Sequence, residues 1–420
     1  MFSGQNSQPQ AVLVGLQLYE EEEWEFEENM KELALLAESA GAEVLASITQ
    51  RADTPHPATY IGRGKVQELK ELVDRRKGEL VIFDDELSPA QQRNVEEVCE
   101  CQVLDRTQLI MDIFARHARS REGKIQVELA QLEYLLPRLR GRGEMLSRLA
   151  GGIGTRGPGE TKLEIDQRRI RDRINKLQQR LEKIKQQRQV QRSKRKQQGI
   201  PQLSLVGYTN AGKSTLLNRL TGAGVSARNS LFVTLDSTTR SLELPSGQKV
   251  LISDTVGFIE KLPHHLIAAF KATLEEVLHS DIILHVINAA HARRDRQRQA
   301  VMRVLSELNA LERPIIQVYN KIDLCQDSDL VENEAAGDEH GVAISALRGE
   351  GIEELLYTIE DTIEKKWRQM KLLLPYKRGE LLDRLYSLGQ VNSVDYLPEG
   401  IQVSVSLEEE KAEKFKEYNC

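Results

Sequence analysis

Short apolar runs alternate with stretches of helical spacing over the first hundred or so residues. The apolar runs have the length of strands and lie at residues 11–18, 44–48, 80–83 and 103–105. Between them, residues 27–40 and 65–76 repeat their apolar positions with helical spacing, and Ser88 followed by Pro89 is typical of a helix start. Strands that alternate with helices predict a small parallel α/β domain over residues 1–106.

A long polar segment with helical spacing follows. Leucines keep one helical stripe through residues 107–140, with Pro137 as an expected local break. A glycine-rich stretch at 151–159 interrupts this pattern, and helical spacing resumes from Thr161 to about Gln198. We expect residues 107–199 to form an antiparallel helical hairpin with a glycine-rich loop.

Two further domains are predicted in the remaining sequence. Strands are expected at 202–206, 241–245, 249–253, 281–287, 314–319 and 342–344, with helices beginning near Lys213, His265, Arg293 and Glu350. This alternation predicts a doubly wound α/β nucleotide-binding domain over residues 200–367. Residues 368–420 form a predicted small α+β domain, with helices at 378–388 and 408–418 and strands near 391–396 and 400–405.

Composition narrows the class of protein. A chain of 420 residues favours several domains, and 40% hydrophobic residues are enough to bury real cores. The net charge of −6 excludes a uniformly basic nucleic-acid-binding protein, although residues 162–196 hold 14 Lys and Arg against 4 Asp and Glu. The four cysteines (Cys99, Cys101, Cys325 and Cys420) show neither a disulfide framework nor a metal-ligand repeat.

The cellular compartment can be predicted from features that the sequence lacks. The first residues lack the basic and apolar regions of a signal peptide, and no apolar run approaches the roughly 18 residues of a membrane span. Cysteines without a disulfide pattern favour a reducing cytosol. We expect a cytoplasmic, monomeric protein that is at most peripherally associated with a membrane.

Residues 207–214 (Gly-Tyr-Thr-Asn-Ala-Gly-Lys-Ser) match a phosphate-binding loop. The glycines let backbone N–H groups approach phosphates, Lys213 can reach the β- and γ-phosphate oxygens, and Ser214 can offer its hydroxyl to Mg²⁺. The loop follows an apolar strand and precedes a helix, which is the context that the motif requires. A P-loop nucleotide site is therefore predicted here.

A second motif, Asp254-Thr255-Val256-Gly257, directly follows the expected strand at 249–253. An acid at this place can hold the Mg²⁺ shell through water, and the N–H of Gly257 can meet the γ-phosphate. One hydroxyl between the two motifs should complete the Mg²⁺ shell. Thr234, Thr238 and Thr239 are all candidates. The order of these motifs resembles the translation-factor-like branch of P-loop GTPases.

A third motif, Asn320-Lys321-Ile322-Asp323, points to guanine rather than adenine. The carboxylate of Asp323 can accept from guanine N1–H and the exocyclic amine, which adenine cannot match. Lys321 would lie along the base, and Asn320 would tie this loop to the phosphate loop. The tripeptide Ser345-Ala346-Leu347 follows another short strand, where a backbone N–H can meet guanine O6.

Two residues bear on the rate of hydrolysis. Ras-like proteins place a water-orienting glutamine just after the glycine of the second motif, whereas this chain has Phe258. An apolar ring cannot orient water, so we expect slow hydrolysis without a partner. Asn210 is similar to the asparagine of potassium-activated GTPases, which makes K⁺ a further candidate cation. The alternative is that Asn210 only tolerates the backbone angles of the loop.

Four N-terminal segments resemble the HflX family closely. They are residues 58–65 (ATYIGRGK), 83–88 (FDDELS), 104–107 (LDRT) and 151–161 (GGIGTRGPGET). Residues 207–215 and 254–258 are similar to the family too, so that the resemblance spans about residues 10–366. The C-terminal segment fits the family less tightly.

The resemblance implies a GTPase that binds the large ribosomal subunit and splits stalled or idle ribosomes, notably under heat stress. Weak ATP hydrolysis is also attributed to some members. By analogy with the family, Thr234 is the switch Mg²⁺ ligand beside Ser214, and Phe232, Val233, Leu235 and Asp236 line the nucleotide. Val233 and Ser237 stand where we expect alanine and proline.

The candidate site is then complete. The catalytic candidates are Lys213, Asp254 and Gly257. The expected GTP-binding residues are Gly207, Tyr208, Thr209, Asn210, Ala211, Gly212, Lys213, Ser214, Thr215, Phe232, Val233, Thr234, Leu235, Asp236, Asp254, Thr255, Val256, Gly257, Asn320, Lys321, Ile322, Asp323, Ser345, Ala346 and Leu347.

The basic segment is the candidate RNA-binding element. A basic helix beside a Gly/Arg-rich loop suits phosphate contacts with ribosomal RNA, and Arg142, Arg156 and Lys162 are the candidate contacts. The competing interpretation is a solvated helix face, the commoner role of a charge run. A GTP switch that acts in ribosome assembly, or on a protein effector without RNA, is the alternative function. A minor adenine-nucleotide site near residues 60–65 is a further, weaker hypothesis.

Overall fold

A computed structural model describes residues 8–149, 162–197, 200–222, 232, 238–259, 261, 276–338, 340–408 and 412–419. The helix expected near His265 lies outside these residues. The chain divides into two compact units. Unit 1 contains Met1–Glu182, Arg228–Leu235 and Lys261–Phe270, and unit 2 contains Lys183–Ala227, Asp236–Glu260 and Lys271–Cys420.

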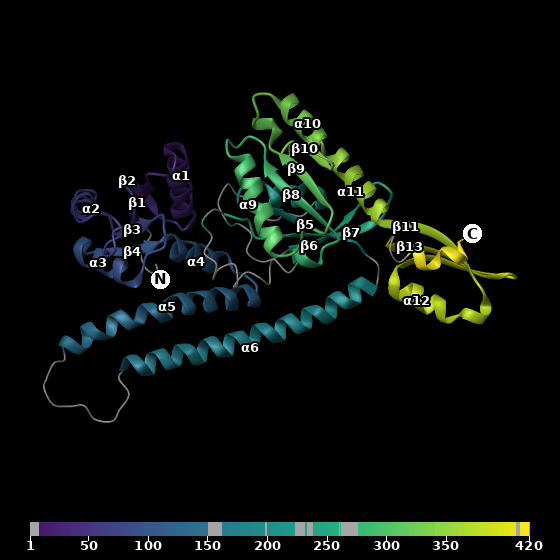
Figure 1. The fold of residues 1–420 in the computed structure, drawn as a ribbon, viewed down its shortest axis with the longest axis horizontal. Helices are drawn as coiled ribbons and strands as arrows, with labels where there is room; N and C mark the ends of the chain where they lie inside the picture. Colours follow the sequence, from purple (N-terminus) through teal and green to yellow (C-terminus); the bar gives the residue numbers. More distant parts are fainter. Residues whose placement is uncertain are drawn as a thin grey trace. The chain divides into compact units, whose positions relative to one another are not determined.

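Unit 1 begins with a four-stranded parallel sheet in the order β2-β1-β3-β4 (Figure 1). Its elements are β1 (Gln10–Leu18), α1 (Glu23–Ser39), β2 (Glu43–Ala52), α2 (Arg63–Arg76), β3 (Leu80–Phe83), α3 (Pro89–Cys99) and β4 (Gln102–Asp105). The start of α3 follows the expected chemistry, because Ser88 and Gln91 form a reciprocal capping box with Pro89 in the first turn. Buried aliphatic side chains of β1 and β3 form the centre of this core.

Three helices follow: α4 (Arg106–His117) and α5 (Arg121–Leu149) in unit 1, and α6 (Lys162–Gln197), which belongs to unit 1 as far as Glu182 and to unit 2 from Lys183. The expected continuous helix over 107–140 is in fact two helices. Ala118 turns to extended backbone angles, and the Ser120 hydroxyl accepts from Gly123 N at 2.8 Å, which starts α5 anew. Pro137, expected to break the helix, lies inside α5.

The two long helices pack against each other, as the predicted hairpin requires. α5 and α6 run side by side in opposite directions (Figure 1), and Arg173 on α6 makes two hydrogen bonds to Glu128 on α5. Ile174 and Leu177 are buried on the same side of α6. The helical spacing of the sequence therefore marks the packed side of α6 correctly.

Unit 2 contains a six-stranded sheet in the order β10-β9-β8-β5-β7-β6, in which only β6 runs antiparallel to its neighbour. Its elements are β5 (Gln202–Gly207), α7 (Lys213–Thr221), β6 (Thr238–Glu243), β7 (Lys249–Asp254), β8 (Ile282–Asn288), α9 (Arg294–Glu307), β9 (Ile315–Asn320), α10 (Ser328–Gly337), β10 (Gly341–Ile344) and α11 (Ile352–Lys366). Helix α10 was not expected from the sequence; the side chain of Asp327 caps it by accepting from Leu330 N at 3.3 Å.

A small antiparallel sheet in the order β11-β13-β12 follows in the same unit. Its elements are β11 (Trp367–Leu374), α12 (Glu380–Leu388), β12 (Gln390–Leu397) and β13 (Gly400–Glu408). Strand β11 was not expected, and the helix predicted at 408–418 is a 3₁₀ segment at Glu413–Tyr418. The predicted α/β fold class, with a helical pair and a small C-terminal α+β part, is confirmed. No helix in the described part of the chain combines the length and apolar character needed to cross a membrane.

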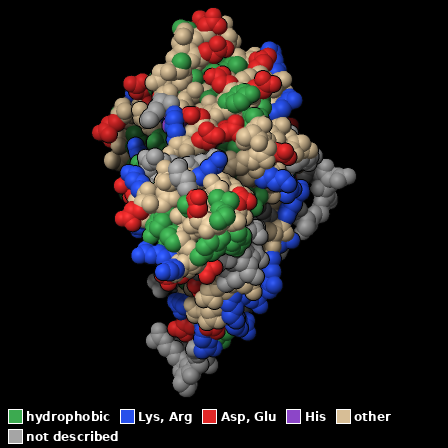
Figure 2. All heavy atoms as spheres, turned by 90° about the vertical axis from the view of Figure 1, so that its right-hand side faces the viewer, with side chains coloured by type: hydrophobic (Ala, Val, Ile, Leu, Met, Phe, Trp, Pro, Cys, Tyr) green, Lys and Arg blue, Asp and Glu red, His purple; other side chains and the backbone are tan. Residues whose placement is uncertain are grey.

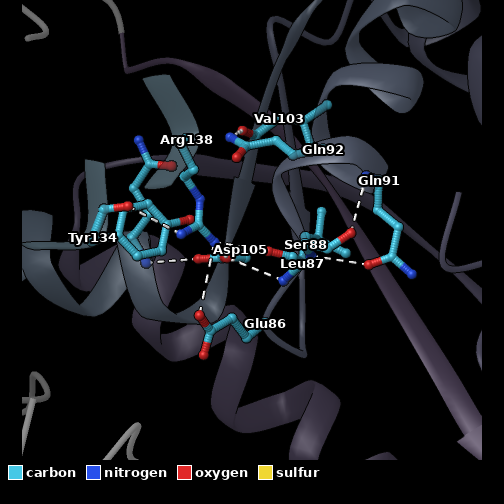
Figure 3. A network of polar contacts seen from close by, with 10 residues as sticks. Glu86, Leu87, Ser88, Gln91, Gln92, Val103, Asp105, Tyr134 and Arg138 are labelled. Carbon is cyan, nitrogen blue, oxygen red and sulfur yellow. Dashed lines mark hydrogen bonds and ion pairs between the residues drawn. The ribbon is translucent and has the colours of Figure 1, made fainter. Parts of the chain in front are cut away.

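A buried carboxylate joins the sheet of unit 1 to its helices. Asp105, at the end of β4, is fully buried and accepts from Leu87 N at 3.1 Å, Gln108 N at 2.8 Å and the Tyr134 hydroxyl at 2.7 Å (Figure 3). Arg138 on α5 adds an ion pair at 3.3 Å. The carboxylate thus caps α4 and fixes α5 at once.

We predict that Asp105→Ala strongly destabilises unit 1. The change leaves a buried hydroxyl, two N–H groups and a guanidinium without their acceptor, which should cost about 3–5 kcal/mol. Hydrogen exchange of the β3 and β4 amides measures this loss as faster opening. The exposed Asp53 is the control, and Asp53→Ala should change stability by no more than about 0.5 kcal/mol. If the two substitutions changed stability equally, the structural role assigned to Asp105 would be contradicted.

Candidate nucleotide-binding site

The phosphate loop lies between β5 and α7, at the carboxyl edge of the central strands. Gly207 has no room for a side chain, because an added Cβ would overlap the carbonyl oxygen of Val286 on β8. Gly212 has a φ of +98°, and a Cβ there would overlap the side-chain amide of Asn320. Both glycines are therefore required by this backbone and not only by a ligand.

Lys213 is folded into its own loop. Its Nζ donates to the carbonyl oxygens of Gly207 at 3.0 Å and Tyr208 at 2.8 Å. Burial lowers the pKa of this amine to about 8, against the opposing charge of Asp254. A buried cation that already faces backbone oxygens is prepared to meet phosphate oxygens.

Ser214 and Asp254 form the candidate metal position. The Ser214 hydroxyl donates to Oδ2 of Asp254 at 2.8 Å, and Asp254 is fully buried at the end of β7. A hydroxyl and a carboxylate are hard oxygen donors of the kind that Mg²⁺ prefers, so these residues fit the ion. Gly257 lies against the loop, because an added Cβ would come within 2.9 Å of Thr209 Cα and 3.0 Å of Lys213 Nζ.

The third hydroxyl for the metal stays a prediction. Thr234 lies outside the described residues, as do Val233, Leu235 and Asp236. Of the other candidates, Thr239 shares a hydrogen bond of 2.8 Å with Ser253, and Thr238 pairs with Asp254 in the β6–β7 ladder.

Phe258 has a backbone role that the sequence did not reveal. Its N–H donates to Gly207 O at 3.1 Å, and its carbonyl accepts from Thr209 N at 2.7 Å. The side chain is buried. Phe258 therefore fastens the second motif to the phosphate loop through main-chain groups, and its buried ring is consistent with the absence of a water-orienting side chain at this position.

The guanine motif is linked to the phosphate loop by one carboxamide. Asn320 donates from Nδ2 to Ala211 O at 2.8 Å, and its Oδ1 accepts from Ala346 N at 3.0 Å. Lys321 Nζ lies 3.5 Å from Asn210 Oδ1, and burial lowers the pKa of Lys321 against the charge of Asp323. The three motifs are thereby brought to one edge of the sheet.

Ser345 orients the carboxylate of Asp323. The Ser345 hydroxyl donates to Oδ1 of Asp323 at 2.7 Å and accepts from Arg348 N at 3.1 Å. Leu347 is 69% exposed, so the end of this tripeptide is open to solvent. A carboxylate held in this way can read a ring that carries two adjacent N–H donors.

The remaining predicted residues occupy supporting positions. Thr255 donates its hydroxyl to Leu205 O at 2.6 Å, and Ala211 and Ala346 are buried in the core of the domain. Asn210 has a φ of +59°, which agrees with its role in the loop backbone and leaves the K⁺ interpretation a prediction. Tyr208 and Thr209 of the loop are buried, as is Val256 of the second motif. Thr215 belongs to α7, and Ile322 packs in a small apolar cluster with Tyr319 and Val331.

Phe232 is placed differently from the other expected nucleotide-binding residues. It belongs to unit 1, where its ring packs edge-on against Phe114 of α4 with centroids 4.6 Å apart. Arg142 and Lys162 lie in α5 and α6, but their side chains, like all of Arg156, lie outside what the structure describes.

Lys261 is a contact that sequence reasoning missed. Within unit 1 its Nζ bonds Asp84 Oδ2 at 2.6 Å and Asp85 Oδ1 at 2.8 Å, and Arg106 also pairs with Asp84 at 2.7 Å. Burial lowers the pKa of Lys261, but Asp84 and Asp85 outweigh it and raise the pKa overall. The local sequence around Lys261 carries no signal for this pairing.

Comparison with known families covers nearly the whole chain. Residues 27–115 match the GTP-binding GTPase N-terminal family, 117–195 the GTP-binding GTPase middle region, 202–321 the 50S ribosome-binding GTPase family and 330–417 the HflX C-terminal domain. GTPase HflX of Caldanaerobacter subterraneus subsp. tengcongensis is 48% identical over 394 residues, which are 94% of this chain and 91% of that protein.

The chain belongs to the HflX family of GTPases.

Two further similarities agree with this assignment. GTPase HflX of Escherichia coli strain K12 is 43% identical over 97% of this chain and 95% of that protein. The crystal structure of the SsGBP and GDP complex is 27% identical over 84% of this chain and 98% of that chain, with a TM-score of 0.50. The resemblance inferred from the N-terminal motifs is confirmed, and the HflX C-terminal match covers the segment that resembled the family least.

We predict that GDP binding to this HflX-family site takes up protons near pH 8. Lys213 has a pKa of about 8, so about half of its amines are neutral at that pH, and a phosphate favours the charged form. Calorimetry at pH 8 in buffers of different ionisation enthalpy should report an uptake of about 0.5 proton per GDP.

Two variants test the source of this proton. Lys213→Arg keeps a permanent charge and should abolish the uptake wherever binding remains measurable. The exposed Lys249 provides the control, and Lys249→Met should leave the uptake unchanged. Binding by the unsubstituted protein without proton uptake at pH 8 would contradict the lowered pKa.

Proposed function

We propose that this protein binds and hydrolyses GTP with Mg²⁺, associates in its GTP form with the large ribosomal subunit, and splits stalled or idle ribosomes under stress. The 50S ribosome-binding GTPase match and the HflX relatives support the partner. The structural observation that carries the proposal is the convergence of a guanine motif and a phosphate loop at one sheet edge, in a chain that also exposes a basic helix.

Each nucleotide contact would follow from the chemistry of the site. Lys213 would exchange its backbone acceptors for phosphate oxygens, and Asp323 would accept from the guanine ring. Ser214 and Asp254 would hold Mg²⁺, which when bound neutralises charge on the phosphates. Because Phe258 offers no polar group to water, hydrolysis would be slow alone and would need a group that the ribosome supplies or orders.

The exposed side of α6 supports an RNA partner. Arg168, Arg171, Lys176 and Arg180 are all exposed within the part of α6 that belongs to unit 1. Positive side chains at successive turns can follow a phosphate backbone by electrostatic attraction. Figure 2 shows one face of the molecule, on which acidic side chains gather toward the top and basic ones toward the lower part, with hydrophobic ones in small groups.

We predict that Asp323→Asn shifts base selectivity from guanine to xanthine. The asparagine amide can donate to the second carbonyl of xanthine, whereas it cannot accept from both guanine donors. Competition between GDP and xanthosine diphosphate measures the change, and the preference should move by at least about 100-fold. The partner Ser345 is a matched control, since Ser345→Ala should weaken both nucleotides without inverting their order. Unchanged guanine preference in Asp323→Asn would remove Asp323 from the base site.

We predict that sedimentation with purified 50S subunits depends on both nucleotide and salt. A non-hydrolysable GTP analogue should promote co-sedimentation, and GDP should not. Lys176→Glu combined with Arg180→Glu should weaken binding by at least about tenfold and flatten its salt dependence. The matched double variant Arg63→Glu with Arg75→Glu changes the same charge on exposed positions of α2 and should bind normally.

Two outcomes would contradict parts of this proposal. One is 50S binding that survives high salt in a chain lacking residues 141–160, which would contradict RNA contact through the basic helix and its loop. The other is a GTPase rate that 50S subunits leave unchanged while a protein partner raises it, which would favour an effector switch. Conversion of 70S particles into subunits with the GTP analogue tests splitting separately from binding.

A further inference from the structure

Unit 1 contains a cavity of about 380 Å³ that the nucleotide site does not use. It lies between α3, α4 and α5, and its volume is within the range of small-ligand pockets. Met111 of α4 and Leu135 and Leu139 of α5 form its apolar part. All of the residues that line it belong to unit 1, so the cavity is a property of that unit alone.

The polar network around Asp105 gives this cavity a fixed wall. Tyr134 and Arg138 line the cavity, and both are bound to Asp105 (Figure 3). The Arg138 guanidinium also stacks on the Tyr134 ring, 3.3 Å from its centroid. Gln92 on α3 donates to Val103 O at 2.7 Å. These bonds hold the three helices in place, so the space is formed before any ligand arrives.

The lining is rich in carboxamides. Gln92, Gln102, Gln108 and Gln131 all contribute to it. Within the described residues, the side chains of Gln102, Gln108 and Gln131 form no hydrogen bond or ion pair with one another or with their surroundings. Each carboxamide offers two donors and one acceptor oxygen, and such groups can bind in pairs to the edge of a base.

The charges in the lining argue against a phosphate. Arg138 is committed to Asp105 and Glu86, and Arg93 pairs with Glu97 across one helical turn. Glu96 and Asp112 add negative charge to the same lining, and burial raises the pKa of Asp112. A polyphosphate would meet as many acids as bases here, whereas a neutral ligand with both donors and acceptors would be matched.

We propose that this cavity binds a nucleobase, with the carboxamides and Asp112 on its polar edge and the apolar side chains against its ring. Asp112 accepts from an exocyclic amino group, so adenine, cytosine and guanine bind better than uracil. The base comes either from a free nucleoside or from an unstacked position in single-stranded RNA. The inference does not depend on ribosome binding, and its test contains no ribosome.

The test uses the full chain with excess GDP, which occupies the GTP site. Adenosine, cytidine, guanosine and uridine are measured by saturation-transfer NMR, and fluorescein-labelled RNA hexamers of A, C or U by anisotropy. We expect the amino-bearing bases to bind at least about tenfold more tightly than uracil. Binding of nucleosides and hexamers alike supports recognition of the base itself, and binding of hexamers alone identifies RNA as its source.

Three variants locate the binding. Leu135→Trp should fill the cavity, and Gln131→Leu should remove a carboxamide without adding bulk; each should lower affinity by at least about tenfold. The control, Gln67→Leu, removes an exposed carboxamide on α2 and should bind as the unsubstituted protein does. If Leu135→Trp fails to fold, Gln131→Leu still decides the question.

Two results would overturn the inference. The first is the absence of binding by any nucleoside or hexamer at millimolar concentration. The second is binding that Gln131→Leu and Gln67→Leu affect equally. Loss of 50S binding would leave the inference untouched, because none of these measurements includes a ribosome.

Discussion

The nucleotide site depends on a single side chain, the carboxamide of Asn320. Its amide reaches the phosphate loop at Ala211, and its oxygen receives the N–H of Ala346 from the loop after β10. Asn320 is 2% exposed, so neither bond competes with bulk water. Because one rigid group serves both loops, the distance between phosphate recognition and base recognition is fixed before a nucleotide binds. An aspartate here would lose the donor, and a leucine would lose both bonds.

Much of the site was readable from local sequence, because each motif directly follows an apolar strand. Residues 207–214, 254–257 and 320–323 lie at the ends of β5, β7 and β9, where parallel strands bring their carboxyl ends together. The strand pattern therefore predicted proximity without any knowledge of tertiary contacts. The roles assigned to Thr234 and to Asn210 as a cation ligand stay predictions.

The sequence did not indicate contacts between residues that are far apart in the chain. It also did not indicate the helix break at which a side chain caps the next helix. Lys261 meets Asp84 and Asp85 across more than 170 positions of the chain, and nothing in the local pattern indicates that pairing. Pro137 lies inside a continuous helix, between Tyr134 and Arg138, which both bind Asp105. The break between α4 and α5 lies earlier and is followed by the Ser120 cap. Likewise, the antiparallel edge strand β6 is defined by its pairing with β7, which no periodicity can reveal.

When Lys213 binds a phosphate, its amine exchanges one hydrogen-bond acceptor for another. The amine already donates two of its three N–H groups to carbonyl oxygens of its own loop, so a phosphate that approaches it competes with those acceptors. The loss and the gain nearly cancel for a weak acceptor, and only an anion with several oxygens tips the balance. We therefore expect the resting loop to favour phosphates over nucleosides and other neutral molecules.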